Sequence, residues 1–305
     1  MKRDLISILD FDEDELGELM RDAEHLRKLR KDGTAHEVLR GKTLAMIFEK
    51  PSTRTRISFD VGMHDLGGSA LYLNTQDLQL GRGEEIRDTA RVAARYVSGV
   101  MIRAYKHSTI VDFARYATVP VINGLSDREH PCQLLADIMT IREHFGSTLD
   151  VNVAWIGDGN NVCNSLVLSA ATTGMIVQAA CPPGYEPAPD MVERANALGG
   201  RVEVVRDPLE AARDADVVMT DTWVSMGTEA ERDKRIKAFQ GYTVTAELVK
   251  EASPDAIVMH CLPAHRGQEI TDEVIEGPQS VVWEEAENRL HAQKALLVKL
   301  IGRNK

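Results

Sequence analysis

The sequence predicts an α/β protein with two doubly wound parallel-sheet domains of similar size. Its 305 residues exceed the size of one typical hydrophobic core. Short apolar segments alternate along the chain with longer segments of helical periodicity, which is typical of parallel strands joined by crossover helices. The alternation starts again at VNVAWIGDG, after the long helical segment HPCQLLADIMTIREHFG, and we therefore expect two sheets.

The first half of the chain is expected to contain four strands. It opens with an amphipathic helix over residues 12–33. The apolar residues that share roughly one face of this helix are Leu16, Leu19, Met20, Leu26 and Leu29. The strands are predicted over residues 43–50, 70–74, 99–104 and 119–124. The helices that follow them are predicted over residues 55–68, 86–97, 108–117 and 130–146. Pro51 ends the first strand, and residues 81–83 are expected to be a polar loop.

The second half repeats this alternation. Strands are predicted over residues 151–159, 175–182, 201–207, 216–223 and 256–263, and a last short strand over 280–286. Helices are predicted over residues 165–174, 191–200 and 209–215. We expect the domains to comprise residues 1–138 and 139–286. A final helix over residues 286–302 is expected to bring residues 287–305 back onto the first domain.

The composition excludes several classes of protein. The net charge of −11, from 36 basic and 47 acidic residues, argues against a general nucleic-acid or anionic-membrane binder. No apolar run approaches the length of a membrane span, and the N-terminus does not resemble a signal peptide. The four cysteines show no CxxC or zinc-binding spacing. We therefore expect no metal and a reducing, cytoplasmic location.

The distinctive polar segments follow predicted strands. In doubly wound sheets, ligands bind outside the carboxyl ends of the strands. The segments at such ends are PSTRTR at 51–56, Arg103, HPCQ at 130–133, Asn160 with Asn161, Asp221, and Cys261. We expect them to converge on one active site, in the cleft between the two domains.

PSTRTR is predicted to bind an oxyanion. A helix N-terminus offers free backbone N–H groups, and hydroxyl and guanidinium groups at the same turn complete a cradle for phosphate. The alternative is that Ser52 or Thr53 only caps the helix while the arginines are solvated. The chain has no GxxxxGK[ST] loop, which argues against a nucleoside triphosphate. GDGNN lacks the third glycine of a dinucleotide turn, so NAD is a weak alternative and no cofactor is expected.

Four motifs, in this order, resemble those of the ornithine carbamoyltransferases within the aspartate/ornithine carbamoyltransferase family. They are PSTRTR, HPCQ, DTWVSMG at 221–227 and HCLPAHRGQEIT at 260–271. The first two are shared by the wider family, whereas HCLPAHRG and the SMG after DTWV resemble the ornithine branch. The resemblance covers nearly the whole chain. It implies transfer of a carbamoyl group from carbamoyl phosphate to the distal amine of ornithine, which gives citrulline and phosphate in arginine or urea-type metabolism.

The resemblance also implies a carbamoyl phosphate site. The residues that it assigns are Ser52, Thr53, Arg54, Thr55, Gln79, Arg103, His130, Gln133, Cys261, Leu262 and Arg289. Arg103 is expected to contact both the phosphate and the carbonyl group. His130 is expected to donate to the carbonyl oxygen, where negative charge develops, and Gln133 to bind the carbamoyl amide. The loop that carries Gln79 is expected to reach an adjoining subunit, which implies a homotrimer.

The resemblance implies an ornithine site in the second domain. Its residues are Asn161, Asp221, Ser225 and Met226. Asp221 would bind the α-ammonium group, and the others would supply donors to the α-carboxylate. The Cys261 thiol would lie beside the distal amine, so the catalytic residues are predicted to be Arg103, His130 and Cys261.

Several alternatives stay open. Arg56 lies one residue deeper in its helix and could equally pair with Glu49, and Cys132 is expected to pack in the core. Putrescine or aspartate could replace ornithine as the amine acceptor, although each suits these motifs less well. The chain could also be a two-domain protein that binds an anionic metabolite without turnover.

Overall fold

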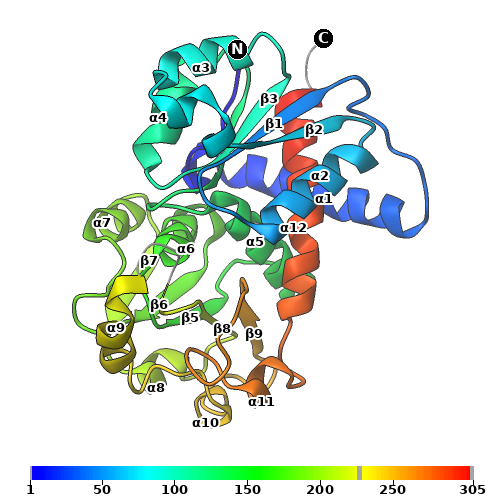
Figure 1. Cartoon of the computed structure of the whole chain (residues 1–305). Coiled ribbons are helices and arrows are strands. Elements are labelled where there is room, and N and C mark those ends of the chain that lie inside the picture. The colour runs from blue at the N-terminus through cyan, green and yellow to red at the C-terminus, as the bar shows by residue number, and fades with distance from the viewer. Residues whose placement is uncertain (1, 225–228, 303–305) are drawn as a thin grey trace. The chain divides into compact units, whose positions relative to one another are not determined.

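The computed structural model describes residues 2–224 and 229–302. The chain divides into two compact units, which are Met1–Met139 with Glu287–Lys305, and Thr140–Ala286. Each unit contains one all-parallel sheet with helices on both faces (Figure 1). The predicted fold class of two parallel-sheet α/β domains is therefore confirmed.

The sheet of the first unit has the order β2-β1-β3-β4. Its strands are β1 (Thr43–Phe48), β2 (Ser69–Asn74), β3 (Gly99–Arg103) and β4 (Val121–Leu125). All four were predicted, because each is a short apolar run that ends at a turn or a helix start. Every side chain of β3 is buried, as expected of a central parallel strand covered on both faces.

Helices cover both faces of this first sheet (Figure 1). They are α1 (Glu13–Lys31), α2 (Thr53–Asp65), α3 (Ile86–Ala93), α4 (His107–Tyr116), and parts of α5 (Pro131–Phe145) and α12 (Val282–Leu297). Ala45, Ile47 and Ile102 point to one face and form a core with α3 and α4. On the other side α2 packs on α12, where a Cβ on Gly62 would lie 3.3 Å from Lys294.

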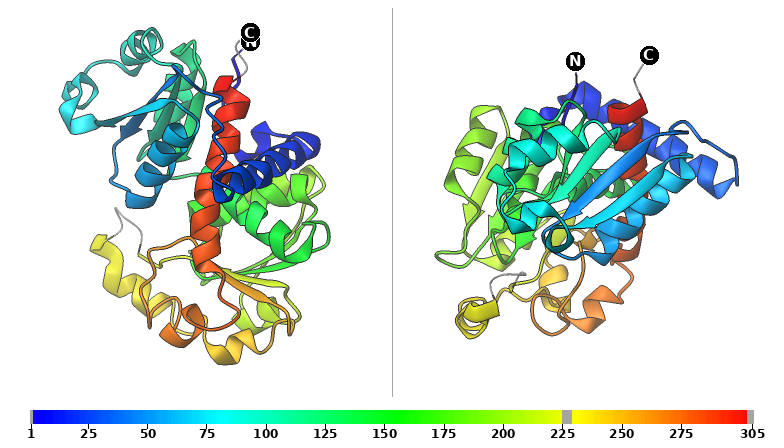
Figure 2. Two further views of the ribbon diagram at one scale, coloured as in Figure 1. Left: turned by 90° about the vertical axis from the view of Figure 1, so that its right-hand side faces the viewer. Right: turned by 45° about the horizontal axis from the view of Figure 1, so that its top comes forward.

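The C-terminal helix also lies beside α1 within the first unit (Figures 1 and 2). Lys299 donates to Glu18 across this contact at 3.3 Å, and Arg27 lies 3.8 Å from Glu287. Beyond Leu297 the helix continues as a π-helical turn over Val298–Gly302. The structure therefore groups residues 287–305 with the first 139 residues.

The sheet of the second unit has the order β7-β6-β5-β8-β9. Its strands are β5 (Asn152–Ile156), β6 (Ile176–Ala180), β7 (Arg201–Val205), β8 (Val217–Thr220) and β9 (Ile257–His260). Its helices include α6 (Asn161–Thr173), α7 (Pro189–Ala197), α8 (Pro208–Ala212), α9 (Arg232–Ala238), α10 (Ala246–Val249) and α11 (Asp272–Ile275). The last three were not predicted, since they are short and lie between strands with little helical periodicity.

The predicted strand over residues 280–286 is wrong. Only Ser280 pairs, in an isolated bridge with Val258, and α12 begins at Val282. The two adjacent valines favoured a strand, but Glu284 and Glu285 are well placed in the first turn of a helix. The predicted loop over residues 81–83 also differs, because Gln79–Arg82 forms a short 3₁₀ turn.

Both sheets reverse their winding between two central strands. In the first sheet the reversal lies between β1 and β3, and in the second between β5 and β8. Ligands of doubly wound folds bind at the carboxyl ends of the strands at such a switch point. Among residues 2–224 and 229–302, no helix is long and apolar enough to cross a membrane.

Candidate active-site residues in each unit

The PSTRTR segment lies at the switch point of the first sheet. Phe48, the last residue of β1, pairs with Arg103, the last residue of β3. Ser52 caps α2, and its Oγ accepts from the backbone N–H of Thr55 at 3.3 Å. The capping role considered for Ser52 is therefore present. Thr53 is exposed and Arg54 half-buried, in the first turn of the same helix.

His130 lies within the field of three guanidinium groups. Burial lowers the pKa of His130 well below its usual value, and Arg289, Arg103 and Arg54 lower it further. These three arginines come from α12, β3 and α2, so distant segments of the first unit bring positive charge to one buried imidazole. At neutral pH His130 is neutral, with one N–H to donate and one lone pair to accept.

Arg289 connects several of the predicted residues. It is buried, and its Nη1 donates to Gln133 Oε1 at 2.6 Å while its Nη2 donates to Thr55 Oγ1 at 3.3 Å. Gln133 is the third residue of α5, directly after Cys132. The structure thus brings together residues from α2, α5 and α12 that the sequence assigned to carbamoyl phosphate.

Three further residues of the first unit have other surroundings. Gln79 is exposed on its 3₁₀ turn. Arg56 lies over the ring of Tyr72, with Cζ 3.9 Å from the ring centroid, and so makes a cation–π contact. Cys132 is buried, its Sγ donates to the carbonyl of Asn123, and burial raises the pKa of its thiol to about 12. Cys132 therefore packs in the core, as expected.

Asp221 is the centre of the candidate site in the second unit. It is buried at the end of β8, where its Oδ1 accepts from Cys261 Sγ at 3.2 Å and from the N–H of Thr222 at 2.7 Å. Its Oδ2 accepts from Asn160 Nδ2 at 2.7 Å. Asn160 also caps α6, so it fixes the helix that begins at Asn161. Ser225 and Met226 lie outside the described residues.

A polar network holds the turn after β9. The N–H of Leu262 donates to His260 Nδ1 at 2.9 Å, so the imidazole hydrogen is on Nε2, which lies 3.2 Å from Glu269 Oε1. Leu262 has a positive φ of 57°, which is unfavourable for a branched side chain. Backbone in such a conformation, held by buried side chains, is common at ligand sites.

One group among the described residues offers several metal-ligating atoms. Single ligand atoms of Asp221, His260 and Cys261 lie within 4.8 Å of one another. Both nitrogens of His260 already have partners, however, in the N–H of Leu262 and the carboxylate of Glu269. A carboxylate and a thiol remain, which is fewer than the three or four protein ligands of a usual zinc site.

A buried ion pair in the second unit was not foreseen from the sequence. Arg235 of α9 donates to Asp158, in the loop between β5 and α6, and also to the carbonyl oxygen of Trp223. Its guanidinium lies over the ring of Tyr185 at 4.7 Å. Burial raises the pKa of Asp158 to about 7, although Arg235 opposes this shift. The only signal in the sequence was the acid of GDGNN.

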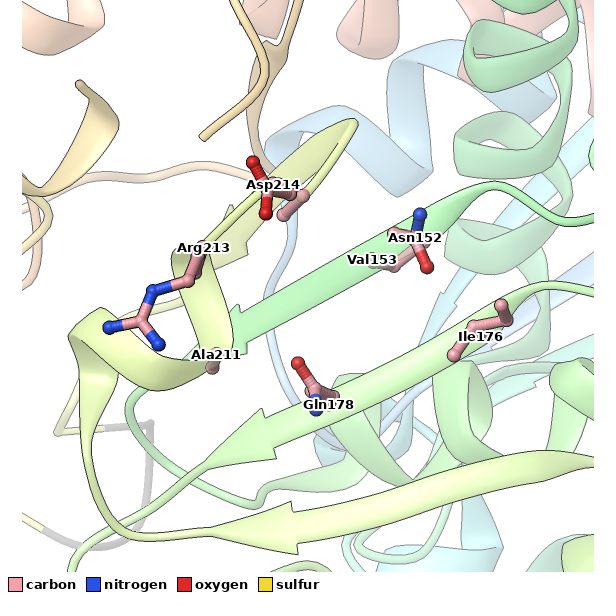
Figure 3. A pocket seen from close by; sticks show the side chains of 8 residues that line it. Asn152, Val153, Ile176, Gln178, Ala211, Arg213 and Asp214 are labelled. Atoms are coloured by element: carbon pink, nitrogen blue, oxygen red, sulfur yellow. The ribbon is translucent and has the colours of Figure 1, made fainter. Parts of the chain in front are cut away.

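A separate small pocket lies elsewhere in the second unit (Figure 3). It has a volume of about 120 Å³ and is lined by residues such as Asn152, Ile176, Gln178 and Arg213. Asn152 and Ile176 are the first residues of β5 and β6. The pocket therefore lies toward the amino ends of these strands, whereas Asn160 and Asp221 follow carboxyl ends, and the two locations do not coincide.

Comparison with known proteins agrees with these observations. A relative from Methanoculleus marisnigri, described as "Ornithine carbamoyltransferase", is 66% identical over 302 residues, which are 99% of this chain and 98% of the relative. One from Archaeoglobus fulgidus with the same description is 58% identical and covers 98% of this chain and 97% of its own. The solved structure "Ornithine carbamoyltransferase from Pyrococcus furiosus" is 53% identical, with a TM-score of 0.96 over 100% of this chain and 98% of that one.

Two family models cover most of the sequence. Residues 3–143 match "Aspartate/ornithine carbamoyltransferase, carbamoyl-P binding domain". Residues 149–300 match "Aspartate/ornithine carbamoyltransferase, Asp/Orn binding domain". With relatives of this identity over nearly its full length, the chain belongs to the aspartate/ornithine carbamoyltransferase family.

Proposed function

We propose that this chain transfers the carbamoyl group of carbamoyl phosphate to the distal amine of L-ornithine, giving L-citrulline and phosphate. One observation carries the proposal: Arg54, Arg103 and Arg289 act together on a buried, neutral His130, in a chain whose net charge is −11. Such a local basic cluster suits a phosphorylated substrate with a polar carbonyl group. The relatives described as ornithine carbamoyltransferases support the choice of acceptor.

The first unit, with residues 287–305, is proposed to bind carbamoyl phosphate. The free N–H groups at the start of the 13-residue helix α2 and its positive dipole end favour the phosphate. The side chains proposed to complete the site are Ser52, Thr53, Arg54, Thr55, Arg103 and Arg289. His130 donates its N–H to the carbonyl oxygen, and Gln133 accepts from the carbamoyl amide.

The second unit, Thr140–Ala286, is proposed to bind ornithine. The Asp221 carboxylate pairs with the α-ammonium group, while Asn161, Ser225 and the backbone of Met226 donate to the α-carboxylate. The Cys261 thiol, which donates to Asp221 at 3.2 Å, lies beside the distal amine. The backbone carbonyls of Cys261 and Leu262 orient the carbamoyl amide.

The reaction follows from these roles. Carbamoyl phosphate binds first and the arginines neutralise its phosphate. The distal ammonium group of ornithine then loses a proton to solvent. The free amine attacks the carbonyl carbon, so that a C–N bond forms and negative charge develops on the carbonyl oxygen. Arg103, His130 and Thr55 stabilise this oxyanion. The C–O bond to phosphate breaks as the carbonyl group re-forms, and the extra proton on the attacking nitrogen passes to the departing phosphate. The phosphate leaves toward the guanidinium groups.

The wider setting is also part of the proposal. We propose a homotrimer in which Gln79 reaches the carbamoyl phosphate site of an adjoining subunit. Gln79 is exposed, as are the apolar side chains of Ile57, Leu71 and Tyr96 in the same unit, which is consistent with a surface for self-association. Four free cysteines favour a reducing compartment such as the cytoplasm, and the reaction would belong to arginine metabolism.

The test is formation of phosphate and of the carbamoylated amine, which is citrulline for ornithine, from carbamoyl phosphate with ornithine, putrescine and aspartate offered in parallel. Rapid turnover with ornithine alone supports the proposal. Turnover with a different amine would leave the carbamoyl phosphate site standing but overturn the ornithine site. Tight carbamoyl phosphate binding without turnover of any amine would indicate a binding protein instead.

A further inference from the structure

A buried acid on α5 contacts one of the proposed substrate residues. Asp137 is fully buried, and its Oδ1 accepts from Gln133 Nε2 at 2.8 Å. The two residues are four apart on the helix and therefore lie on the same face. At the other end of the same side chain, Gln133 Oε1 accepts from Arg289 at 2.6 Å. All three residues are buried in the first unit.

These two contacts determine which way the Gln133 amide faces. A guanidinium has only donors, so it must meet the amide oxygen, and a carboxylate has only acceptors, so it must meet the amide nitrogen. Turning the amide by 180° would place oxygen against oxygen at Asp137 and nitrogen against nitrogen at Arg289. In a buried site each such mismatch leaves polar groups unsatisfied, which is costly.

The network continues from Arg289 to α2. In the amide orientation that satisfies both of its ends, Gln293 Oε1 accepts from Arg289 Nε at 3.0 Å and its Nε2 donates to Ser58 at 2.6 Å. The Ser58 hydroxyl donates to the backbone carbonyl of Arg54 at 2.7 Å. Arg289 is therefore held in place from several sides, and it cannot turn away to release the Gln133 amide without breaking these contacts.

We propose that Asp137 is a positioning residue that makes the enzyme selective for a carbamoyl group. It holds Gln133 Nε2, so that the acceptor Oε1 faces the side of Arg289 and Thr55, where carbamoyl phosphate is proposed to bind. A carbonyl oxygen accepts two hydrogen bonds, and Oε1 can therefore take an N–H of the substrate beside that of Arg289. This inference rests on the proposed function of the chain.

The consequence is discrimination among acyl phosphates. The carbamoyl group presents an N–H donor where acetyl phosphate presents a methyl group. An acceptor oxygen fixed at this position stabilises the first and offers nothing to the second. Sites built to pair a substrate N–H reject analogues that lack it, because the protein group then stays unpaired.

The first experiment compares wild type with Asp137→Asn, which keeps the shape but replaces a carboxylate that can only accept with an amide that can turn either its oxygen or its nitrogen toward Gln133. We measure the KM for carbamoyl phosphate and the competitive Ki values of acetyl phosphate and inorganic phosphate. We expect the KM to rise about tenfold, as for the loss of one good hydrogen bond, while both Ki values change by less than about twofold. A general loosening of the site would weaken all three ligands together, and that result would overturn the proposal.

The matched control is Asp65→Asn, which also removes an acid from the first unit. Asp65 pairs with Arg30 and Lys294 and does not contact Gln133 among the described interactions. We expect this control to leave the ratio of the acetyl phosphate Ki to the carbamoyl phosphate KM unchanged. If this ratio of Ki to KM falls equally in Asp137→Asn and Asp65→Asn, Asp137 has no specific role.

A second pair of variants tests the positioning of residue 133 by residue 137, even where Asp137→Asn alone fails to fold. In Gln133→Glu two carboxylates meet, whereas in Gln133→Glu/Asp137→Asn the new amide donates to the new carboxylate, which keeps an acceptor toward the substrate. The double variant should bind carbamoyl phosphate at least about tenfold more tightly than Gln133→Glu alone. Equal affinities would overturn the proposal. A wild-type chain that forms no citrulline would instead overturn the proposed function, and this inference with it.

Discussion

At the residue scale, the most informative feature is a histidine that stays neutral among arginines. Burial and three guanidinium groups all disfavour the imidazolium form of His130. A neutral imidazole adds no charge to a site that already has enough to bind phosphate, and its N–H remains available to a carbonyl oxygen. In the proposed mechanism the arginines bind the phosphate, and His130 and Arg103 chiefly stabilise the oxyanion.

The first prediction concerns these two residues. His130→Ala or Arg103→Ala should lower citrulline turnover by roughly two to three orders of magnitude, because removing one donor to a developing oxyanion costs about 2.7–4 kcal/mol of barrier. Turnover is measured at saturating substrates, and circular dichroism checks that each variant folds. The control is Arg40→Ala, a surface arginine paired with Glu37. Turnover within tenfold of wild type would remove the variant residue from the mechanism.

The second prediction concerns the pH dependence of stability. The pKa of His130 is depressed in the folded chain, so below about pH 6.5 the unfolded chain binds one proton more than the folded chain. The free energy of unfolding should therefore fall as the pH falls below this value, by up to about 1.4 kcal/mol per pH unit for this group. In His130→Asn that part of the slope should be missing.

Urea titrations between about pH 5 and pH 8 measure this slope. Burial also lowers the pKa values of His107 and His291, but they contribute equally to both proteins. The two curves should diverge only on the acid side and run parallel above about pH 7.5. Parallel curves across the whole range would mean that the pKa of His130 is the same in the folded and the unfolded chain.

At the element scale, the second unit joins two loops through the Asp158–Arg235 pair. Asp158 precedes the cap of α6, and Arg235 lies on α9 and also bonds the carbonyl of Trp223, two residues after Asp221. The pair therefore fixes both segments that flank the proposed ornithine residues. Because an arginine keeps its charge in proteins, removing the Asp158 carboxylate leaves the buried guanidinium uncompensated, which typically costs about 3–5 kcal/mol.

The third prediction follows from this pair. Asp158→Asn should lower the free energy of unfolding by about 3–5 kcal/mol, and Arg235→Met/Asp158→Asn should regain a large part of the loss, since no charge is then left buried alone. Chemical denaturation of the wild type, both single variants and the double variant gives the coupling energy. Losses that simply add in the double variant would show that the two side chains do not stabilise each other.

The elements also show what the sequence can and cannot predict. The nine described strands were foreseen because each is a short apolar run before a turn, and the motifs at their carboxyl ends follow from the switch-point rule. One such turn is GDGNN, after β5. A Cβ on Gly159 would lie 2.1 Å from the backbone of Glu186, so this position needs glycine for close backbone packing and not for binding a dinucleotide. Helices α9 to α11 were not predicted, because their apolar residues show no strong helical periodicity.

The partners that position the site were beyond the reach of the sequence. Asp137 and Arg235 lie outside the named motifs, and Glu269 lies within HCLPAHRGQEIT but was given no role. Their contacts depend on how helices and loops pack in three dimensions. The wrongly predicted strand at 280–286 also reflects contacts that the sequence does not reveal. The local β propensity is outweighed by helix α12, in which Glu285 accepts from the N–H of His260.

At the scale of the whole molecule, the end of the chain belongs to the unit formed by its beginning. Four large aliphatic side chains of the C-terminal segment are buried, which are Leu296, Leu297, Leu300 and Ile301. Burying each contributes about 1.5–3 kcal/mol, so together they supply about 6–12 kcal/mol. That sum is comparable with the whole stability of a typical domain, about 5–15 kcal/mol. The same segment also provides Arg289 to the proposed phosphate site.

The last prediction is that a chain ending at Ala286 cannot keep its first unit folded. Calorimetry of the truncated chain should show one cooperative unfolding transition fewer than the full chain, and binding of inorganic phosphate should disappear.

Point variants of the full chain separate the loss of core packing from the loss of Arg289. Leu296→Ala should cost about 2–5 kcal/mol of stability, whereas Trp283→Ala, on the same helix but 54% exposed, should cost less than about 0.5 kcal/mol. Arg289→Met should weaken phosphate binding with little loss of the transition. A truncated chain that still unfolds cooperatively and binds phosphate would show that the segment is an appendage, because neither the core nor the site of the first unit would then depend on it.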